Sequence, residues 1–322
     1  MTASAEAIDI SVVIPVYNSS STAREMVQRL GAVFDGIERS WEVIFVDDGS
    51  RDDSWSVLTE VHQADPHHVV AIQLMRNFGQ DNAIMCGLRR ARGQYIVTMD
   101  DDLQHPPEEI PKMLVALEQQ KLDVVFGIPD DKKHAAWRNI GSTMIDSFFR
   151  VIFDTKIRIC SFRVVRRKLI DAILSYEFNF TFIDGLLAWN TRRMGEVTVD
   201  HQPRKAGQTG YSIRKLVVLA LNLFANFSLL PLQLTSLLGV GVAAGGICVA
   251  LIYLVMALQD NITVPGYAST IVAILFLGGV QLLALGIIGE YLGRLHMNVN
   301  RKPQYSVRNV LSDSPATNDD RD

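Results

Sequence analysis

The sequence has few cysteines, no cysteine motif for a metal and no excess of positive charge. Its three cysteines, Cys86, Cys160 and Cys248, are widely spaced, and no Cys-x-x-Cys pair is present. A disulfide scaffold and a zinc site are therefore excluded, and we expect three reduced, buried thiols. The 31 Lys and Arg residues against 35 Asp and Glu residues give a net charge of -4. This balance excludes the strongly basic character of a typical nucleic-acid-binding protein.

Common catalytic and targeting signals are also missing from the 322 residues. We find no phosphate-binding P-loop, no Gly-x-Gly-x-x-Gly fingerprint and no Ser/His/Asp arrangement. The N-terminal segment carries Glu6 and Asp9 and has no basic region before its first short apolar run, so it does not resemble a signal peptide. We therefore expect the N-terminal part of the chain to stay in the cytoplasm.

Between residues 216 and 289 the chain is almost free of charged side chains, with Asp260 as the one exception. Leu216–Gln259 and Asn261–Gly289 contain no Asp, Glu, Lys or Arg. A membrane-spanning helix needs about 20 apolar residues, so the first run is too long for one span, and Pro231 divides it. A chain of this size has no core large enough to bury two such runs.

We therefore predict three helices in this region, a surface helix and two membrane spans. They cover Leu216–Leu230, Leu232–Leu258 and Ala268–Ile288, respectively. Cations flank the pair of spans and are missing from the loop between them, which predicts that both ends are cytoplasmic. These cations are Arg214, Lys215, Arg294, Arg301, Lys302 and Arg308. We expect a disordered tail after Leu311.

The first 212 residues alternate strand-like and helix-like segments. The strand-like runs are continuously apolar, which indicates a mostly parallel sheet covered on both faces. Thr22 and Glu25 fit a capping box, and Pro106 to Glu109 fit the first turn of another helix. This α/β, doubly wound pattern places ligands at the carboxyl ends of the strands. The predicted strands are Ile10–Val16, Trp41–Val46, Val69–Leu74, Tyr95–Met99 and Asp123–Phe126.

Acidic residues follow two of these strands, as Asp47-Asp48-Gly-Ser and as Asp100-Asp101-Asp102. Each cluster alone is also explained by a turn or a helix cap. Together, at one edge of a sheet, they favour a bound cation or a donor-rich ligand, because packed acids repel. In an extended segment Asp100 and Asp102 point to the same side, which offers two carboxylates to one divalent ion.

Four arginines are either phosphate contacts or surface charges: Arg76, Arg138, Arg163 and Arg204. Arg204 and Lys205 stand in a polar, glycine-containing loop just before the first apolar run. A cationic loop of this kind beside a membrane suits a phosphate that arrives from the lipid side.

The motifs VVIPVYN, VDDGS, RNFGQ, MDDDLQHPPEEI, GQTGYS and GEYLGR resemble, in this order, the family 2 glycosyltransferases of the GT-A fold. More narrowly, the chain is similar to the polyprenyl-phosphate glycosyltransferases, which include GtrB-type, ArnC-type and dolichyl-phosphate mannose synthase-like members. The resemblance runs from Ile10 to about Tyr305, and the two-span tail is most like the GtrB branch.

The resemblance implies transfer of a sugar from a nucleotide donor, UDP-linked, to undecaprenyl or another polyprenyl phosphate. It implies Mg²⁺ or Mn²⁺ held by Asp100 and Asp102, and catalytic roles for Asp102, Arg163 and Arg204. Arg204 and Lys205 would meet the acceptor phosphate. The donor-binding positions it implies are Pro15, Tyr17, Asn18, Asp47, Asp48, Arg76, Asp101 and Gln104.

Three positions depart from the family pattern. Ser19 replaces a usual glutamate, Ser161 replaces a frequent acid before the Phe-Arg pair, and Gly210 replaces a frequent lysine. A catalytic base is not required, because a phosphate monoester with a second pKa of about 6 is mostly dianionic at neutral pH. Direct attack on the sugar predicts inversion at its anomeric carbon.

The expected layout is a GT-A catalytic domain over 1–212, a juxtamembrane helix over 213–231, two spans over 232–290 and a cytoplasmic tail over 291–322. We expect an inner-membrane enzyme for cell-envelope glycans, with a downstream flippase and self-association through the surface helix. Two alternatives are a processive polysaccharide synthase, whose usual QxxRW motif is missing, and a non-catalytic scaffold that binds nucleotide sugars.

Overall fold

The computed structural model describes residues 8–129, 157–177, 181–202, 230–258, 266–299 and 303–313. The chain forms two compact units. The first combines Met1–Gly210 with Pro303–Asp322, and the second is Tyr211–Lys302. The second unit therefore interrupts the first along the chain.

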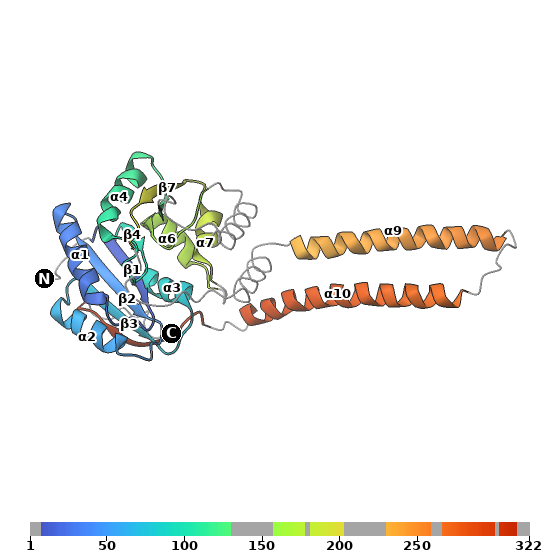
Figure 1. The fold of residues 1–322 in the computed structure, drawn as a ribbon, viewed down its shortest axis with the longest axis horizontal. Coiled ribbons are helices and arrows are strands. Elements are labelled where there is room, and N and C mark those ends of the chain that lie inside the picture. The colour runs from blue at the N-terminus through green and yellow to red at the C-terminus, as the bar shows by residue number, and fades with distance from the viewer. Residues whose placement is uncertain are drawn as a thin grey trace. The chain divides into compact units, whose positions relative to one another are not determined.

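The first unit is built on an eight-stranded sheet with the order β7-β5-β6-β4-β1-β2-β3-β8. Its centre, β4-β1-β2-β3, labelled in Figure 1, is parallel, and β5 also pairs parallel with β7. By contrast, β6 is antiparallel to β4 and β5, and β8 is antiparallel to β3. The strands are β1 Ile10–Val16, β2 Trp41–Asp47, β3 Val69–Leu74, β4 Tyr95–Thr98, β5 Val124–Pro129, β6 Arg163–Arg166, β7 Met194–Val199 and β8 Val307–Leu311.

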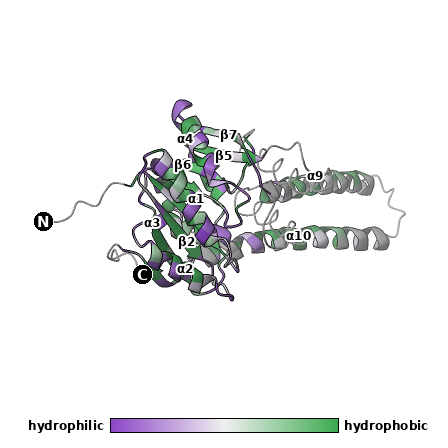
Figure 2. Cartoon of the chain, turned by 60° about the vertical axis from the view of Figure 1, so that its left-hand side comes forward, coloured by the Kyte–Doolittle hydropathy of each residue, from purple (hydrophilic) through white to green (hydrophobic). Residues whose placement is uncertain are grey.

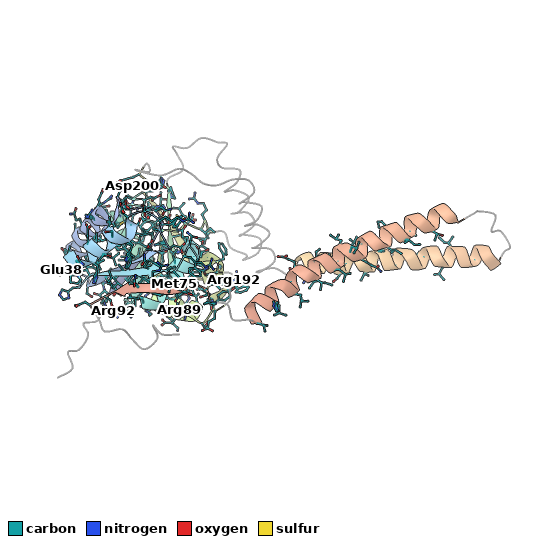
Figure 3. The ribbon with its side chains drawn as sticks, turned by 90° about the horizontal axis from the view of Figure 1, so that it is seen from below. Glu38, Met75, Arg89, Arg92, Arg192 and Asp200 are labelled. Carbon is teal, nitrogen blue, oxygen red and sulfur yellow. The ribbon has the colours of Figure 1, made fainter. Side chains whose placement is uncertain are left out.

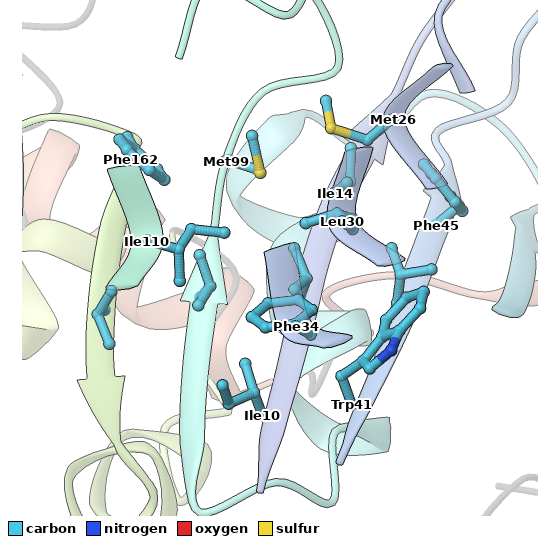
Figure 4. Packing of buried hydrophobic residues seen from close by; sticks show 14 of the residues in the cluster. Ile10, Ile14, Met26, Leu30, Phe34, Trp41, Phe45, Met99, Ile110 and Phe162 are labelled. Carbon is cyan, nitrogen blue, oxygen red and sulfur yellow. The ribbon is translucent and has the colours of Figure 1, made fainter. Parts of the chain in front are cut away.

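Helices cover both faces of this sheet, as the apolar strands predicted. Alternate residues of β1 enter different cores: Ile14 packs in one cluster and Val13 in the other. The first cluster, drawn in Figure 4, includes Met26, Leu30 and Phe34 from one face of α1. Helices α1 Ala23–Gly36, α2 Ser54–Ala64 and α4 Ile110–Gln119, preceded by the short η1 Pro107–Glu109, contribute to this cluster. Helices α3 Gln80–Arg90, α6 Arg167–Leu174 and α7 Ile183–Asn190 contribute to the other.

All five predicted strands are present, with ends that shift by up to three residues. The capping box at α1 is wrong, because the side chain of Thr22 makes no capping hydrogen bond. The predicted cytoplasmic tail, 291–322, contains a strand that was not predicted. This strand, β8, follows the second long helix and pairs with β3. Residues 314–322 lie outside the described residues.

The second unit contains two long helices, α9 Leu230–Leu258 and α10 Tyr267–Val299, which contact each other (Figure 2). Phe276–Gly293 in α10 is long and apolar enough to cross a membrane, and none of it is buried. In α9 the apolar stretch found by the same criterion, Thr235–Gly246, is shorter. Cys248 on α9 is exposed and Cys160 is half-buried, which corrects the prediction of three buried thiols; only Cys86, packed in the sheet unit, is buried. Of the predicted surface helix only Leu230 is described, and it begins α9.

Candidate active site

The predicted acidic clusters lie at one edge of the sheet, because the strands that precede them are parallel neighbours. The backbone N–H of Asp48 donates to the carbonyl of Val16 at 2.9 Å, which joins the ends of β2 and β1. The N–H of Met99 donates to the carbonyl of Val13 at 3.3 Å, which joins β4 to β1. Three chain segments that are distant in sequence thus meet at the carboxyl ends of the central strands.

The loop after β1 is fastened to the loop after β2. Asn18 has a left-handed backbone, with φ of 52°, and its N–H donates to Ser50 Oγ at 2.9 Å. Its side-chain Oδ1 accepts a bond from the N–H of Arg51, also at 2.9 Å. Tyr17 is 46% exposed beside it, whereas Pro15 is half-buried inside β1, opposite Val46. Of these predicted donor contacts, Tyr17 and Asn18 are therefore exposed to a ligand, whereas Pro15 is not fully accessible.

Asp47 and Asp48 are both buried, and both fix loops. Asp47 Oδ1 accepts a bond from the N–H of Ser50 at 3.0 Å, which holds the turn. Asp48 accepts from the N–H groups of Phe78 at 2.7 Å and Gly79 at 2.9 Å. Burial raises the pKa of the Asp48 carboxyl, and these two hydrogen bonds oppose the rise. Asp48 therefore positions the segment after β3.

Gly49 makes the approach of these loops possible. Its φ is 67°, and a Cβ atom at this position would lie 2.4 Å from the backbone carbon of Arg76. Arg76 itself is exposed, and its guanidinium lies over the Phe78 ring, 4.3 Å from the centroid. A glycine is thus required where the β2 loop passes the β3 loop.

The second acidic cluster follows β4 and is a turn, not the extended segment predicted: Asp101 and Asp102 lie in the turn, and Leu103 directly after them has a left-handed φ of 59°. Asp100 Oδ2 accepts a hydrogen bond from Ser161 Oγ at 2.7 Å, and Oδ1 accepts from Gln80 Nε2 at 2.7 Å. Asp102 Oδ1 accepts from the N–H of Gln104 at 3.1 Å. Asp100 is therefore oriented by two side chains, and Asp102 by a backbone N–H group.

The three acids influence one another. Burial raises the pKa of Asp100, and the negative charge of Asp102 adds to the rise. Burial also raises the pKa of Asp101 to about 7, although a hydrogen bond from Ser19 lowers it. Ser19, one of the departures from the family pattern, therefore contacts the middle acid of the cluster.

Arg163 is 2% exposed and forms a buried polar network rather than a surface phosphate contact. Its Nε donates to Thr98 Oγ1 at 2.8 Å, and its Nη1 pairs with Asp184 at the start of α7. Thr98 Oγ1 in turn donates to the carbonyl of Ser161 at 2.8 Å. The guanidinium is thus two hydrogen bonds away from the residue that holds Asp100.

Asp81, on the first turn of α3, faces the same network. Burial raises its pKa to about 7, the charge of Asp184 adds to the rise, and Arg163 opposes it. The backbone N–H of Ile183 donates a hydrogen bond to it, which ties α3 to α7. Burial also raises the pKa of Asp184, against the effect of Arg163. Two carboxyls thus share one buried arginine.

His105 lies buried behind the acidic turn. Its ring stacks on Phe162, 5.1 Å between centroids, and its Nε2 lies 3.6 Å from Cys160 Sγ. Burial lowers the pKa of His105 to about 4, with a contribution from His201, and Asp102 opposes the shift. His105 is therefore a neutral ring that supports the turn from behind.

Sequence reasoning missed three polar residues of this site, Gln80, Asp81 and Asp184, and named Ser161 only as a departure from the family pattern. Gln80 and Ser161 hold Asp100, while Asp81 and Asp184 surround Arg163. Asp184 stands alone within the apolar stretch FIDGLLAW, which is a usable signal for a paired buried acid. Arg138, Arg204 and Lys205 lie outside the described residues.

Asp100 and Asp102 fit a hard divalent cation. Burial raises the pKa of Asp100 and the charge of Asp102 adds to the rise, and a cation between the two carboxylates would relieve this repulsion. Within the described ranges no group of three or more His, Cys, Asp or Glu side chains is arranged to hold a metal. Two carboxylates suffice for Mg²⁺ when waters and substrate phosphates complete its shell.

Comparison with known proteins places these motifs in a family. Residues 11–174 match the family described as glycosyl transferase family 2. Over 313 residues the chain is 37% identical to an undecaprenyl-phosphate 4-deoxy-4-formamido-L-arabinose transferase of Pseudomonas paraeruginosa. That match covers 95% of this chain and 91% of the relative, so it includes both long helices.

Solved structures support the same fold. Glucosyl-3-phosphoglycerate synthase of Mycobacterium tuberculosis, in complex with Mn²⁺, UDP and glucosyl-3-phosphoglycerate, aligns with a TM-score of 0.50 at 17% identity. The match covers 68% of this chain and 78% of that one. The same enzyme with Mn²⁺, UDP and phosphoglyceric acid aligns with a TM-score of 0.50 at 18% identity, over 68% and 76%. At such identities the likeness concerns the α/β fold alone.

Proposed function

Because this chain belongs to glycosyltransferase family 2, we propose that it transfers one sugar from a UDP-linked donor to undecaprenyl or another polyprenyl phosphate. One observation carries the proposal: the undecaprenyl-phosphate transferase of P. paraeruginosa matches 95% of the chain, from the sheet through both long helices. Such a reaction needs a polar site for the nucleotide sugar and an apolar environment for the polyprenyl chain. The acidic edge of the sheet is proposed to supply the first, and the apolar helix α10 the second.

The proposed metal site consists of Asp100 and Asp102, which would hold Mg²⁺ or Mn²⁺. A divalent ion there supplies the positive charge that stabilises the leaving nucleoside diphosphate. Ser161 and Gln80 orient Asp100 through its two oxygens, and the N–H of Gln104 orients Asp102. The M. tuberculosis enzyme with the same fold binds Mn²⁺ and UDP, which supports this assignment.

In the proposed donor pocket, exposed Tyr17 and Asn18 contact the nucleoside, and exposed Arg76 lies next to Gly49 of the β2 loop. Asp47 and Asp48 shape the pocket through the loops that they fix. The other proposed donor-side residues are Pro15 in β1, and Asp101 and Gln104 in the acidic turn.

The acceptor phosphate attacks C1 of the sugar directly. Most of it is dianionic at neutral pH, because its second pKa is about 6, so no general base is needed. Arg204 and Lys205 are proposed to bind this phosphate, which would align it for an in-line displacement that inverts the anomeric centre. Arg163, also proposed as catalytic, would act through its buried contacts with Thr98 and Asp184.

The second unit anchors the enzyme in the inner membrane in this proposal. Helix α10 contributes one span, and α9 is proposed as the other, with both chain ends cytoplasmic. The proposed layout keeps 1–212 as the catalytic domain, 213–231 as a juxtamembrane helix, 232–290 as the two spans and 291–322 as the tail, whose strand β8 pairs with the catalytic sheet. Self-association through the juxtamembrane helix, a downstream flippase and a role in cell-envelope glycans complete the proposal.

Two other functions are alternatives to transfer of a single sugar. A processive polysaccharide synthase would lengthen a glycan instead of adding one sugar, and it lacks support from the QxxRW motif. A nucleotide-sugar-binding scaffold without activity would tolerate loss of the acids that bind metal.

Replacement of Asp102 by Asn tests the proposed chemistry. The change removes one carboxylate from the metal pair, so we expect loss of transfer by at least about 100-fold with little change in melting temperature. The matched control is Asp65→Asn, whose carboxylate accepts from His68 in the loop before β3. Transfer by Asp102→Asn at the wild-type rate would contradict the metal assignment and favour a different site.

A further inference from the structure

The strand that follows the second long helix contacts the end of β3, next to the candidate active site. β8 pairs antiparallel with β3, and the carbonyl of Ser306 accepts a hydrogen bond from the N–H of Met75 at 2.8 Å. Met75, which Figure 3 labels, directly follows β3 and directly precedes Arg76. Residues after α10 therefore contact the segment that leads into the proposed donor pocket.

Two side chains connect β8 to Asp47. Asn309 stands directly opposite Gln73 in the ladder, and its Nδ2 donates to Gln73 Oε1 at 2.8 Å. Gln73 Nε2 then donates to Asp47 Oδ2 at 3.4 Å. The other oxygen of Asp47 accepts the N–H of Ser50, so this buried carboxylate is shared between the turn and the side chains from β3 and β8.

A second contact fastens the backbone before Arg76. The register shifts between Gln73 and Leu74, and the residue that it leaves over on β8 is Arg308. Its Nη2 donates to the carbonyl of Met75 at 3.0 Å. Bulges of this kind redirect a side chain near active sites. Here the guanidinium of Arg308 binds the backbone carbonyl of Met75, the residue before Arg76.

We infer that Asn309 and Arg308 are positioning residues of the nucleotide pocket, supplied by the chain that follows the membrane unit. Neither side chain lies at the ends of β1 and β4, where the sugar and metal are proposed to bind. Both act through one intermediate, Gln73 for Asn309 and Met75 for Arg308. The inference rests on the proposed function to the extent that Asp47 and Arg76 belong to the donor pocket.

The direction of the hydrogen bonds from Asn309 through Gln73 to Asp47 predicts which substitution of Asn309 is the more harmful. Because Asn309 donates to the amide oxygen of Gln73, the amide nitrogen of Gln73 is turned toward Asp47. A carboxylate at position 309 would accept from Gln73 instead and turn its amide oxygen toward Asp47, where two acceptors repel. Asn309→Asp should therefore be more harmful than Asn309→Leu, which removes the bond without reversing it.

The experiment measures binding of UDP to the full-length protein in detergent and lipid by calorimetry. We expect the Kd for UDP to rise about tenfold in Asn309→Asp and about threefold in Asn309→Leu, the scale of one charged or one neutral hydrogen bond. Arg308→Ala should also weaken binding, and Arg308→Lys should restore most of it. In turnover, KM for the donor should rise while KM for the lipid stays unchanged.

Ser312→Ala is the matched control, because Ser312 joins the same segment to Arg90 on α3, through a bond of 2.9 Å, away from the pocket. It should leave the Kd for UDP unchanged. In a Gln73→Leu background, Asn309→Asp should have no further effect. An equal loss of binding in that background, or wild-type binding by Asn309→Asp, would overturn the inference.

The outcomes separate this inference from the proposed function. Wild-type protein that binds UDP but makes no lipid product would refute the proposed acceptor and leave the Asn309 comparison decisive. Wild-type protein that binds neither UDP nor GDP would overturn both. A general drop in melting temperature shared by the Asn309 variants and Ser312→Ala would assign β8 a purely structural role.

Discussion

The two oxygens of Asp100 accept hydrogen bonds from side chains of two different elements, Gln80 on α3 and Ser161 just before β6. Bonds of this kind to a metal-binding carboxylate orient it, and their loss commonly weakens metal affinity by about 10- to 100-fold. Ser161→Ala should therefore raise the Mg²⁺ or Mn²⁺ concentration needed for half-maximal transfer by about tenfold. Titration of activity with each metal measures this effect.

Two variants make the Ser161 result specific. Ser161→Thr keeps the hydroxyl and should restore the metal requirement. Ser175→Ala removes a hydroxyl that bonds to the carbonyl of Ala172 at the end of α6, and should leave the requirement unchanged. An unaltered metal requirement in Ser161→Ala would show that Asp100 does not depend on this bond.

His105 predicts a pH dependence of stability. Burial lowers its pKa to about 4 from the ordinary 6.5, with His201 adding to the shift and Asp102 opposing it. The folded state therefore resists protonation. The associated stability is fully present above pH 6.5 and is lost as pH falls from 6.5 toward 4, by about 3 kcal/mol.

The variant His105→Phe keeps the ring against Phe162 and removes the titration. Unfolding measured across this pH range should show a shallower loss of stability in His105→Phe than in the wild type. Parallel curves for the two proteins would contradict a neutral, buried His105. The readout is the slope of the free energy of unfolding against pH. A constant change in stability caused by the altered ring therefore does not affect the comparison.

The sequence located the acids of the site but not their partners. Asp47, Asp48 and Asp100 were found because acids after continuous apolar strands must meet at one sheet edge. The burial of Arg163 was not predictable, because its partner Asp184 lies 21 residues further along and reaches it only through packing of α7. Local spacing carries no information about such a pair.

Helix α3 packs closely on the centre of the sheet through Gly87. A Cβ atom there would lie 2.4 Å from Cγ1 of Val13 and 3.2 Å from Cγ2 of Val46. In an open helix, Gly→Ala gains about 1 kcal/mol. Here the stiff valines have no room to move, and overpacking costs about 1 to 3 kcal/mol, so Gly87→Ala should be destabilising overall.

Gly36→Ala is the control, because Gly36 ends α1 with nothing within 4 Å of a new Cβ atom. Thermal unfolding should show a lower melting temperature for Gly87→Ala and an unchanged or slightly raised one for Gly36→Ala. Since α3 also carries Gln80 and Asp81, the Gly87 variant should lose activity as well. A stabilised Gly87→Ala would mean that α3 sits further from the sheet.

Prediction of the elements succeeded where apolar runs were continuous and failed where they were short or polar. β1 and β3 have the predicted bounds. β6, with the sequence RVVR, and β8, with VRNVL, join the sheet antiparallel and gave no comparable signal. Their pairing depends on β4 and β3, respectively, which is information about the fold and not about the segment.

At the scale of the whole molecule, the order of the chain links the two units. The sheet begins in Met1–Gly210 and receives its last strand from Pro303–Asp322, with the long helices between. Residues 291–322 were predicted to be a tail because they follow the last apolar run. In the fold, part of this segment is β8, a strand of the eight-stranded sheet. The prediction of apolar helices after position 230 needed no such information, since length and hydropathy sufficed.

The most direct test of the account is a transfer assay with the full-length protein, undecaprenyl phosphate, Mg²⁺ or Mn²⁺ and a panel of nucleotide sugars. Mass spectrometry of the lipid phase reads the product. We predict that one donor, a UDP-sugar, adds the mass of a single sugar to the lipid phosphate. A lipid that stays unmodified with every donor, while the protein binds nucleotide, would contradict the account and favour the non-catalytic scaffold.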